Sequence, residues 1–278
     1  MSNINRYKGE VTRGPSVALW GDLAKLEADK NAGKCQFFFD DFQAWSTHTV
    51  NTNANIISST GAWKVQADAG VLVNPVANSV DLANGEHGVL VIQDADADND
   101  EAYLSRVVDN FRFDLTYGLK TYYEARVKVE TVNTGIAFLA GFALNSTIAA
   151  DMIAADSTAL VSTASFVGFQ VLDATGTVIR TTFQKASQTQ QYVSNTAGTL
   201  VSNTWVKLGL LYDPFTGSGK AIRFFIDGIE LPDYATQAQV SASTFPDDVN
   251  VTPFFGFKID GTGNLDGFVD WIAAAQYL

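Results

Sequence analysis

The stretch TYYEARVKVE, residues 121–130, alternates between two kinds of side chain. From Tyr123 to Val129 every second residue is apolar, and from Glu124 to Glu130 the intervening residues are charged. Successive side chains of a β-strand point to opposite faces of the sheet, so one face of this strand is expected to be buried and the other to lie in water. The stretch therefore predicts a strand of an antiparallel sheet.

Short runs rich in aromatic and β-branched residues recur on both sides of this strand, from residue 35 to the end of the chain. They are FFFDDF at 37–42, HGVLVIQ at 87–93, IAFLAGFAL at 136–144, SFVGFQVLD at 165–173, WVKLGLLY at 205–212, AIRFFIDGIEL at 221–231, TPFFGFKI at 252–259 and FVDWIAAAQYL at 268–278. Turn sequences rich in Gly, Asn, Asp and Pro separate them. The pattern predicts an all-β sandwich or barrel. Within residues 35–278, only residues 146–164 suggest a helix or a long loop.

The composition favours one large domain and excludes several classes of partner. The chain has 278 residues, 46% of them hydrophobic, enough apolar surface for one large sandwich. Its 18 Lys and Arg against 30 Asp and Glu give a net charge of −12, which repels nucleic acid. No run resembles a membrane helix or a signal peptide, and the single cysteine, Cys35, has no disulfide partner in the chain. We expect a protein made in a reducing cytoplasm, with no nucleic-acid or membrane partner.

Residues 1–34 differ in charge from the rest of the chain. They hold six basic and four acidic residues, a net charge of +2, which leaves −14 for residues 35–278. Asp22 is a candidate helix N-cap and Gly33 a candidate stop, so a short helix is expected between them. We therefore divide the chain into an extended or helical N-terminal arm, 1–34, and a β-sandwich domain, 35–278.

The arm has the features of an anchoring segment. Trp20, Leu23 and Leu26 would be buried in a neighbouring subunit, while Arg13 and the other basic residues meet an acidic surface. These four residues are our candidates for partner binding. A frayed tail is the alternative.

An acidic run, IQDADADNDEAYL, occupies residues 92–104. Asp94, Asp96 and Asp98 match the first ligands of an EF-hand loop, but the required Gly and the bidentate Glu are replaced by Asn99 and Ser105. A different calcium site formed by the three aspartates stays open. A solvated hairpin turn is favoured, because strand-like runs flank it. No other metal or cofactor is expected, since the two histidines, His48 and His87, lack partners at zinc spacing.

The order of three segments resembles the concanavalin A-like jelly roll of legume lectins, laminin G-like modules and laminarinase-type glycosidases. The segments are YYEARVKV, then TWVKLGLLYDPFTGSGKAIRFFIDGIEL, then the terminal DGFVDWIAAAQ. The resemblance covers residues 37–278 and implies a concanavalin A-like jelly-roll sandwich. It also implies a carbohydrate site in which an exposed aromatic ring stacks on a sugar. Trp45, Trp63, Tyr192 and Asn195 are the candidates for that site.

The glycosidases of this group carry the pattern E-x-D-x-x-E on one strand, which holds an acid and a nucleophile on the same face. The corresponding strand here, SFVGFQVLDA, contains no Glu. Other carboxylate pairs, such as Glu124 with Glu130, are interpreted as surface charge. We expect a protein that is not an enzyme, with no catalytic residues; a degenerate glycosidase or lyase is the third interpretation.

A second resemblance is to structural proteins of tailed bacteriophages that carry a jelly-roll body. It is based on GEHGVLVIQDADADNDEAYL followed by YYEARVKV, and on LWGD and KCQFFFDDF near the N-terminus. It implies a virion protein that decorates or cements the capsid, anchored by its arm to capsid proteins and copies of itself. The alternative is a glycan-binding module on the virion surface or tail, with a host-surface glycan as its partner.

Overall fold

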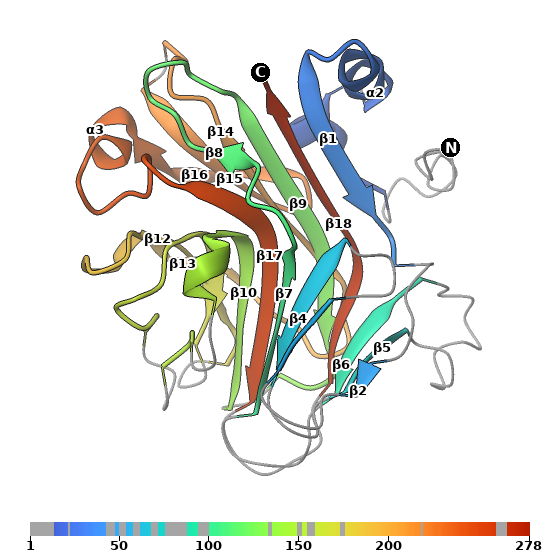
Figure 1. The fold of residues 1–278 in the computed structure, drawn as a ribbon. Helices are drawn as coiled ribbons and strands as arrows, with labels where there is room; N and C mark the ends of the chain where they lie inside the picture. Colours follow the sequence, from blue (N-terminus) through green and yellow to red (C-terminus); the bar gives the residue numbers. More distant parts are fainter. Residues whose placement is uncertain are drawn as a thin grey trace.

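The computed structural model describes most of the chain in fourteen segments. They are residues 14–21, 23–42, 48–49, 54–57, 62–67, 72–75, 88–93, 100–132, 135–148, 152–154, 159–172, 176–217, 219–259 and 266–278. The strands form two antiparallel sheets that pack face to face (Figure 1). No helix among these segments is long and apolar enough to cross a membrane.

The first sheet, sheet A, has the strand order β16-β15-β14-β9-β18-β6-β5-β2, and β1 also pairs with β18. Its strands are β1 Cys35–Asp40, β2 His48–Thr49, β5 Leu72–Pro75, β6 Leu90–Gln93, β9 Thr121–Val129, β14 Val206–Tyr212, β15 Lys220–Ile226, β16 Ile229–Thr236 and β18 Asp266–Tyr277. The stretch that alternates in the sequence is thus β9, between β14 and β18 in the middle of the sheet.

The second sheet, sheet B, has the order β13-β12-β11-β10-β17-β7-β4-β3, and β8 also pairs with β17. Its strands are β3 Ala54–Ile57, β4 Trp63–Ala67, β7 Glu101–Arg106, β8 Phe111–Arg112, β10 Ile136–Ala143, β11 Phe166–Val171, β12 Val178–Gln184, β13 Gln191–Thr199 and β17 Asn250–Ile259. The described residues also form short helices. Helices α1 Val17–Trp20 and α2 Leu23–Asn31 precede β1, the 3-10 turn η3 Asn145–Thr147 follows β10, and α3 Gln237–Val240 lies between β16 and β17.

The inner faces of the two sheets form the main core. The apolar phase of β9, from Tyr123 to Val129, lies in this core as expected. Phe169 of sheet B packs edge to face against Phe224 of sheet A, with ring centroids 5.5 Å apart. Aromatic contacts of this kind across the layer explain why the chain needs so many Phe residues.

The charged phase of β9 departs from the expectation that it lies in water. Glu124 is fully buried and Lys128 almost so, although both project from the outer face of sheet A. Ser16 and Trp20 of the arm cover Glu124, and the rings of Trp205 and Phe268 cover Lys128. The alternation of β9 alone reveals neither cover. The interpretation of Glu124 as surface charge is therefore wrong.

The described part of the arm packs on the body of the same chain. Leu19, Trp20 and Leu26 form an apolar cluster with side chains of β1, β9, β14, β15 and β18. The Trp20 ring stacks on Tyr122 with centroids 5.6 Å apart. Since Trp20 is only 4% exposed, the apolar surface that we expected the arm to offer a neighbouring subunit is occupied within the chain.

The outer face of sheet B is covered by residues from the segment between β10 and β11. Met152, Ile153 and Leu160 are buried there in an apolar cluster with side chains of β7, β10, β11 and β17. Lys258 Nζ donates a 3.0 Å hydrogen bond to the Ile153 carbonyl. Where the sequence left a helix or a long loop open, the structure has η3 and, farther on, an antiparallel bridge between Ile153 and Leu160.

Candidate functional site

A tight turn before β9 presents the most exposed aromatic side chain among the described residues. Asp114 Oδ1 accepts hydrogen bonds from the backbone N–H groups of Thr116, at 2.7 Å, and Tyr117, at 3.0 Å. The turn ends at Gly118, whose φ of 62° lies in the left-handed region that favours glycine. Tyr117 between them is 77% exposed. The sequence DLTYG thus builds a fixed turn with a tyrosine in water.

The turn between β14 and β15 lies against this first turn. Phe215, which is 60% exposed, packs so closely over Gly118 that a Cβ atom there would lie 2.0 Å from Phe215 Cε2. Lys120 Nζ forms an ion pair of 2.9 Å with Asp213 Oδ2. The aromatic contact and the ion pair hold the two turns together.

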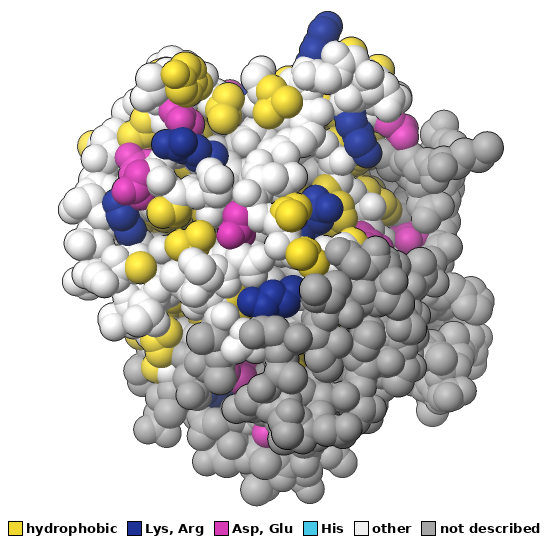
Figure 2. All heavy atoms as spheres, viewed as in Figure 1, with side chains coloured by type: hydrophobic (Ala, Val, Ile, Leu, Met, Phe, Trp, Pro, Cys, Tyr) yellow, Lys and Arg dark blue, Asp and Glu magenta, His cyan; other side chains and the backbone are white. Residues whose placement is uncertain are grey.

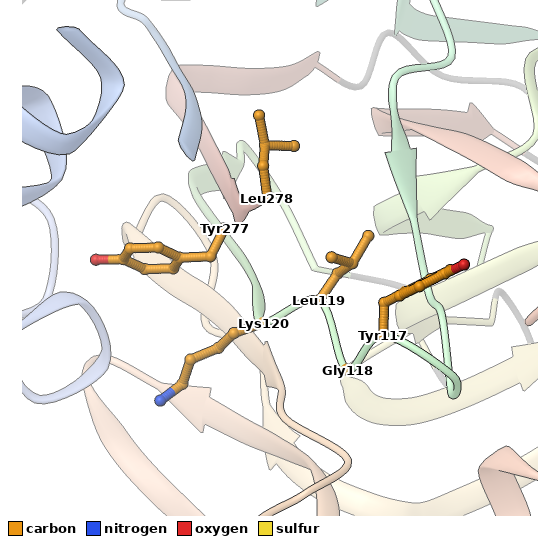
Figure 3. Close-up of a pocket in the computed structure, with 6 residues that line it drawn as sticks. All are labelled: Tyr117, Gly118, Leu119, Lys120, Tyr277 and Leu278. Atoms are coloured by element: carbon orange, nitrogen blue, oxygen red, sulfur yellow. The ribbon is translucent and has the colours of Figure 1, made fainter. Parts of the chain in front are cut away.

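A pocket of about 530 Å³ opens beside Tyr117 at the C-terminal end of β18 (Figure 3). Its lining residues are Tyr117, Gly118, Leu119, Lys120, Tyr277 and Leu278. Figure 3 shows the two tyrosine rings on opposite sides of the pair of leucines, with the Lys120 side chain extending on the Tyr277 side. The pocket therefore combines two aromatic rings, an apolar floor and one cation.

Backbone and side-chain hydrogen bonds fix the Tyr277 wall. The Tyr277 N–H donates to the Lys120 carbonyl, and the Leu278 N–H donates to the Lys34 carbonyl, each at 3.0 Å. The Tyr277 hydroxyl donates to Asp29 Oδ2 on α2 at 3.3 Å. Figure 1 shows the C-terminus beside α2 and β1 at one end of the sandwich. The arm thus borders the pocket.

The charge states of the polar groups follow from their neighbours. Burial, together with the charge of Asp29, raises the pKa of Tyr277 to about 12. Burial alone would lower the pKa of Lys120, but the hydrogen bond to Asp213 and the charges nearby raise it above its ordinary value. At neutral pH the pocket holds a neutral phenol and a lysine cation. The side chains of its lining residues offer contact area and hydrogen bonds.

The described glycan candidates that we chose from the sequence do not line this pocket. Trp63 is fully buried in the main core and donates to Asp40 Oδ2 at 2.8 Å, so it is not a sugar platform. Tyr192 is half-buried on β13 with the Arg180 guanidinium 5.7 Å from its ring centroid, and Asn195 is exposed on the same strand. Trp45 lies outside the described residues.

The other sequence candidates are distributed as follows. Trp20 and Leu26 are buried against the body and Leu23 is half-buried, whereas Arg13 lies outside the described residues. The calcium candidates Asp94, Asp96 and Asp98 also lie outside them, so calcium stays a prediction.

The end of the acidic run is described, and it is not solvated. Asp100 and Glu101 are buried, and Glu101 Oε2 lies 3.8 Å from Lys258 Nζ. The Tyr103 hydroxyl also donates to Glu101. A solvated turn is therefore the wrong interpretation for these two residues, because β7 already begins at Glu101.

The strand without the E-x-D-x-x-E pattern is β11. Phe166 lies in the cluster on the outer face of sheet B, whereas Val167 and Phe169 lie in the main core. Gln170 is fully buried and accepts a 2.6 Å hydrogen bond from Gln190. Met152, Ile153, Leu160 and Ala164 cover part of this face. The pocket beside Tyr117 lies instead at the end of the sandwich.

The sequence reasoning missed Tyr117, Lys120 and Tyr277. A signal for Tyr117 was present, because an Asp and a Gly four residues apart between two strand-like runs indicate a turn, and a large aromatic inside a turn is exposed. Nothing local connects Tyr277 with Tyr117, since their proximity depends on the pairing of β18 with β9.

No protein-family profile matches the chain, and no curated protein matches it by sequence. Solved structures match it in shape. A protein of unknown function from Shewanella oneidensis is 11% identical, with 87% of each chain covered and a TM-score of 0.51. A beta-1,3-glucanase from Mycobacterium marinum is 13% identical, with 85% of this chain and 97% of that chain covered and a TM-score of 0.44.

A third match is a mixed linkage glucan GH16 protein of Bacteroides ovatus in complex with its G4G4G3G product. It is 14% identical, with 85% of this chain and 99% of that chain covered and a TM-score of 0.46. At such identities the likeness shows the fold alone. The concanavalin A-like jelly-roll sandwich expected from the sequence is confirmed.

The same comparisons correct one expectation about activity. The prediction that the chain is not an enzyme is wrong, because structures similar in shape are named as a beta-1,3-glucanase and as a glycoside hydrolase family protein. The missing pattern on β11 describes a single strand and does not exclude catalysis. Nothing in the names of these structures connects the fold with a phage particle.

Proposed function

We propose that the chain binds a carbohydrate in the pocket beside Tyr117. The observation that carries this proposal is the Tyr117 ring, 77% exposed on a turn held by Asp114 and bordering a cavity of about 530 Å³. An exposed apolar surface beside a concave site is a feature of binding surfaces. The C–H face of a sugar ring is a flat apolar partner of matching shape for such a ring.

The remaining pocket residues suit the same ligand. Leu119 and Leu278 add apolar contact, while the Tyr277 hydroxyl and Lys120 Nζ provide hydrogen-bonding groups for sugar hydroxyls. The hydrogen bonds of the Asp114 turn and the Lys120–Asp213 pair hold the walls before a ligand arrives. Little ordering entropy then opposes binding.

The phage-particle role suggested by the sequence resemblance receives no support from the fold. The glycan-binding alternative is supported by an exposed aromatic pocket and by a fold found in glucan-binding structures. The proposed function is therefore carbohydrate binding, with no assignment to a virion.

Titration calorimetry against a panel of neutral and acidic oligosaccharides tests the proposal. The wild type, Tyr117→Ala and Tyr192→Ala are compared, because Tyr192 is the tyrosine of the rival site on β13. We expect Tyr117→Ala to weaken binding at least about tenfold and Tyr192→Ala to leave it unchanged. The reverse result would move the site to β13, and a wild type that binds no member of the panel would refute the function.

A further inference from the structure

We infer that the pocket beside Tyr117 takes neutral sugar rings and discriminates against acidic glycans such as oligouronates. This inference rests on the proposed function and adds the class of ligand. Its basis is the arrangement of charges around the pocket, in which Lys120, the cation among the lining residues, already contacts a carboxylate.

Lys120 is the single cation among the six lining residues, and its charge is matched. Its Nζ lies 2.9 Å from Asp213 Oδ2, and the Asp213 side chain is only 18% exposed. Under the same turn, Arg112 Nε lies 3.5 Å from Asp114 Oδ2. An incoming carboxylate would have to compete with Asp213 for Lys120 rather than meet an available cation.

The other wall of the pocket adds negative charge. The Tyr277 hydroxyl donates to Asp29, so the group that faces this carboxylate is a phenol that stays neutral at pH 7. The chain as a whole carries −12. On the face drawn in Figure 2, basic and acidic side chains of the described residues lie interspersed rather than in separate patches. An acidic glycan therefore meets repulsion from Asp213 and Asp29 at the two walls of the pocket.

A neutral ring does not meet this repulsion. Its contacts with Tyr117, Leu119 and Leu278 depend on apolar area, and hydroxyl groups can accept from Lys120 or donate to Asp213 without disturbing the ion pair. The Lys120–Asp213 pair then acts as a specificity determinant. It supplies one donor and one acceptor with no net charge.

The test uses two ligands that differ at C6, a gluco-tetraose and the same tetraose in which each hydroxymethyl group is oxidised to the carboxylate of a glucuronate. Calorimetry at low salt is expected to show the neutral ligand binding at least about tenfold more tightly. The difference should narrow as sodium chloride is raised, because salt screens repulsion at an exposed site, whereas the affinity for the neutral ligand should hardly change.

Asp213→Asn provides the decisive variant, because it leaves the charge of Lys120 unmatched. We expect the ratio of acidic to neutral affinity to rise by about threefold to fivefold. Asp248→Asn is the matched control, since it removes one negative charge from another lysine pair, Lys185–Asp248 at 2.7 Å. Melting temperatures of both variants are measured in parallel.

The outcomes separate the inference from the function on which it rests. Binding of the acidic ligand as tightly as the neutral one, or an equal response of the Asp213 and Asp248 variants, would overturn the inference while leaving carbohydrate binding intact. Failure of both ligands to bind would refute the proposed function itself, and the inference with it.

Discussion

The indole Nε1 of Trp20 donates a 2.7 Å hydrogen bond to Oε2 of Glu124, across 104 residues of sequence. The same oxygen accepts the Ser16 N–H at 2.9 Å. Lys207 Nζ donates at 3.2 Å to the Gly14 carbonyl beside them. A buried carboxylate on the outer face of β9 thus anchors α1, and this polar contact fixes how the arm lies on the sheet.

Replacing Trp20 by Ala should lower the free energy of unfolding by about 3–5 kcal/mol. The change removes a large buried ring and leaves Glu124 without one of its donors. Urea unfolding measures the effect. Val17→Ala on the same helix is the control, because Val17 is 73% exposed and should change stability by less than about 0.5 kcal/mol. Equal effects would mean that α1 does not dock in solution.

Gly209 of β14 has no side chain, and the Leu19 side chain of α1 fills the space above it. A Cβ atom at this position would lie 2.5 Å from Leu19 Cδ2. Gly209→Ala is therefore expected to destabilise the protein by about 1–3 kcal/mol through overpacking. In a Leu19→Ala background the clash is gone, so the same change should cost less. A double-mutant cycle in urea checks this, and additive effects would show that the two residues do not touch.

The stability of the protein should depend on pH through Glu124. Burial raises the pKa of this carboxyl above its ordinary value of 4.5, although the hydrogen bonds from Ser16 and Trp20 and the charge of Lys207 oppose the shift. A raised pKa in the folded state means that the protonated form is the stabilised one. The contribution is fully present below pH 4.5 and is lost as the pH rises through the raised value.

Glu124→Gln tests this dependence, because the amide keeps the shape and an acceptor oxygen but cannot ionise. Unfolding free energies of both proteins are measured from pH 4 to pH 8. The wild type should lose stability relative to Glu124→Gln as the pH rises, since all other titrating groups are common to both. A constant difference across this range would show that Glu124 does not titrate there.

The sequence predicted the two packed sheets better than the segments that cover their outer faces. Period-two alternation in β9 placed Tyr123 and Val129 in the core because strand geometry alone decides which side chains share a face. The same alternation gave the wrong environment for Glu124, because this side chain is buried by Trp20, more than 100 residues away in the sequence. Periodicity carries no information about such docking.

The candidate site was less accessible to sequence reasoning. Trp63 was chosen as an exposed aromatic, yet in a sandwich the large rings fill the space between the sheets. Tyr117 sits in a turn whose Asp and Gly are visible in the sequence, but its pocket also needs Tyr277. The pairing of two strands far apart in the chain brings these walls together.

Lys258→Met should destabilise the protein by about 3–5 kcal/mol. The variant leaves the buried Glu101 carboxylate without the Lys258 ammonium, which lies 3.8 Å away, and frees the Ile153 carbonyl. Urea unfolding measures the loss. Lys185→Met is the control, because the Lys185–Asp248 pair is exposed and should contribute less than about 1 kcal/mol. A small effect at Lys258 would show that the contacts over sheet B do not depend on this charge.

Gly118→Ala should impair both the turn and the pocket, for two reasons that a second glycine separates. Gly118 has φ 62°, and an added Cβ would lie 2.0 Å from the Phe215 ring, which must move. Gly219, in the adjoining turn, has φ 73° but no atom within 4 Å of an added Cβ. Both alanine variants should lose about 1 kcal/mol of stability from backbone strain, measured by urea unfolding.

Only Gly118→Ala displaces Phe215, so only this variant should weaken glycan binding, by about tenfold in calorimetry. Equal loss of binding in the two variants would mean that general loosening of the turns, rather than the packing of Phe215 on Gly118, controls the pocket.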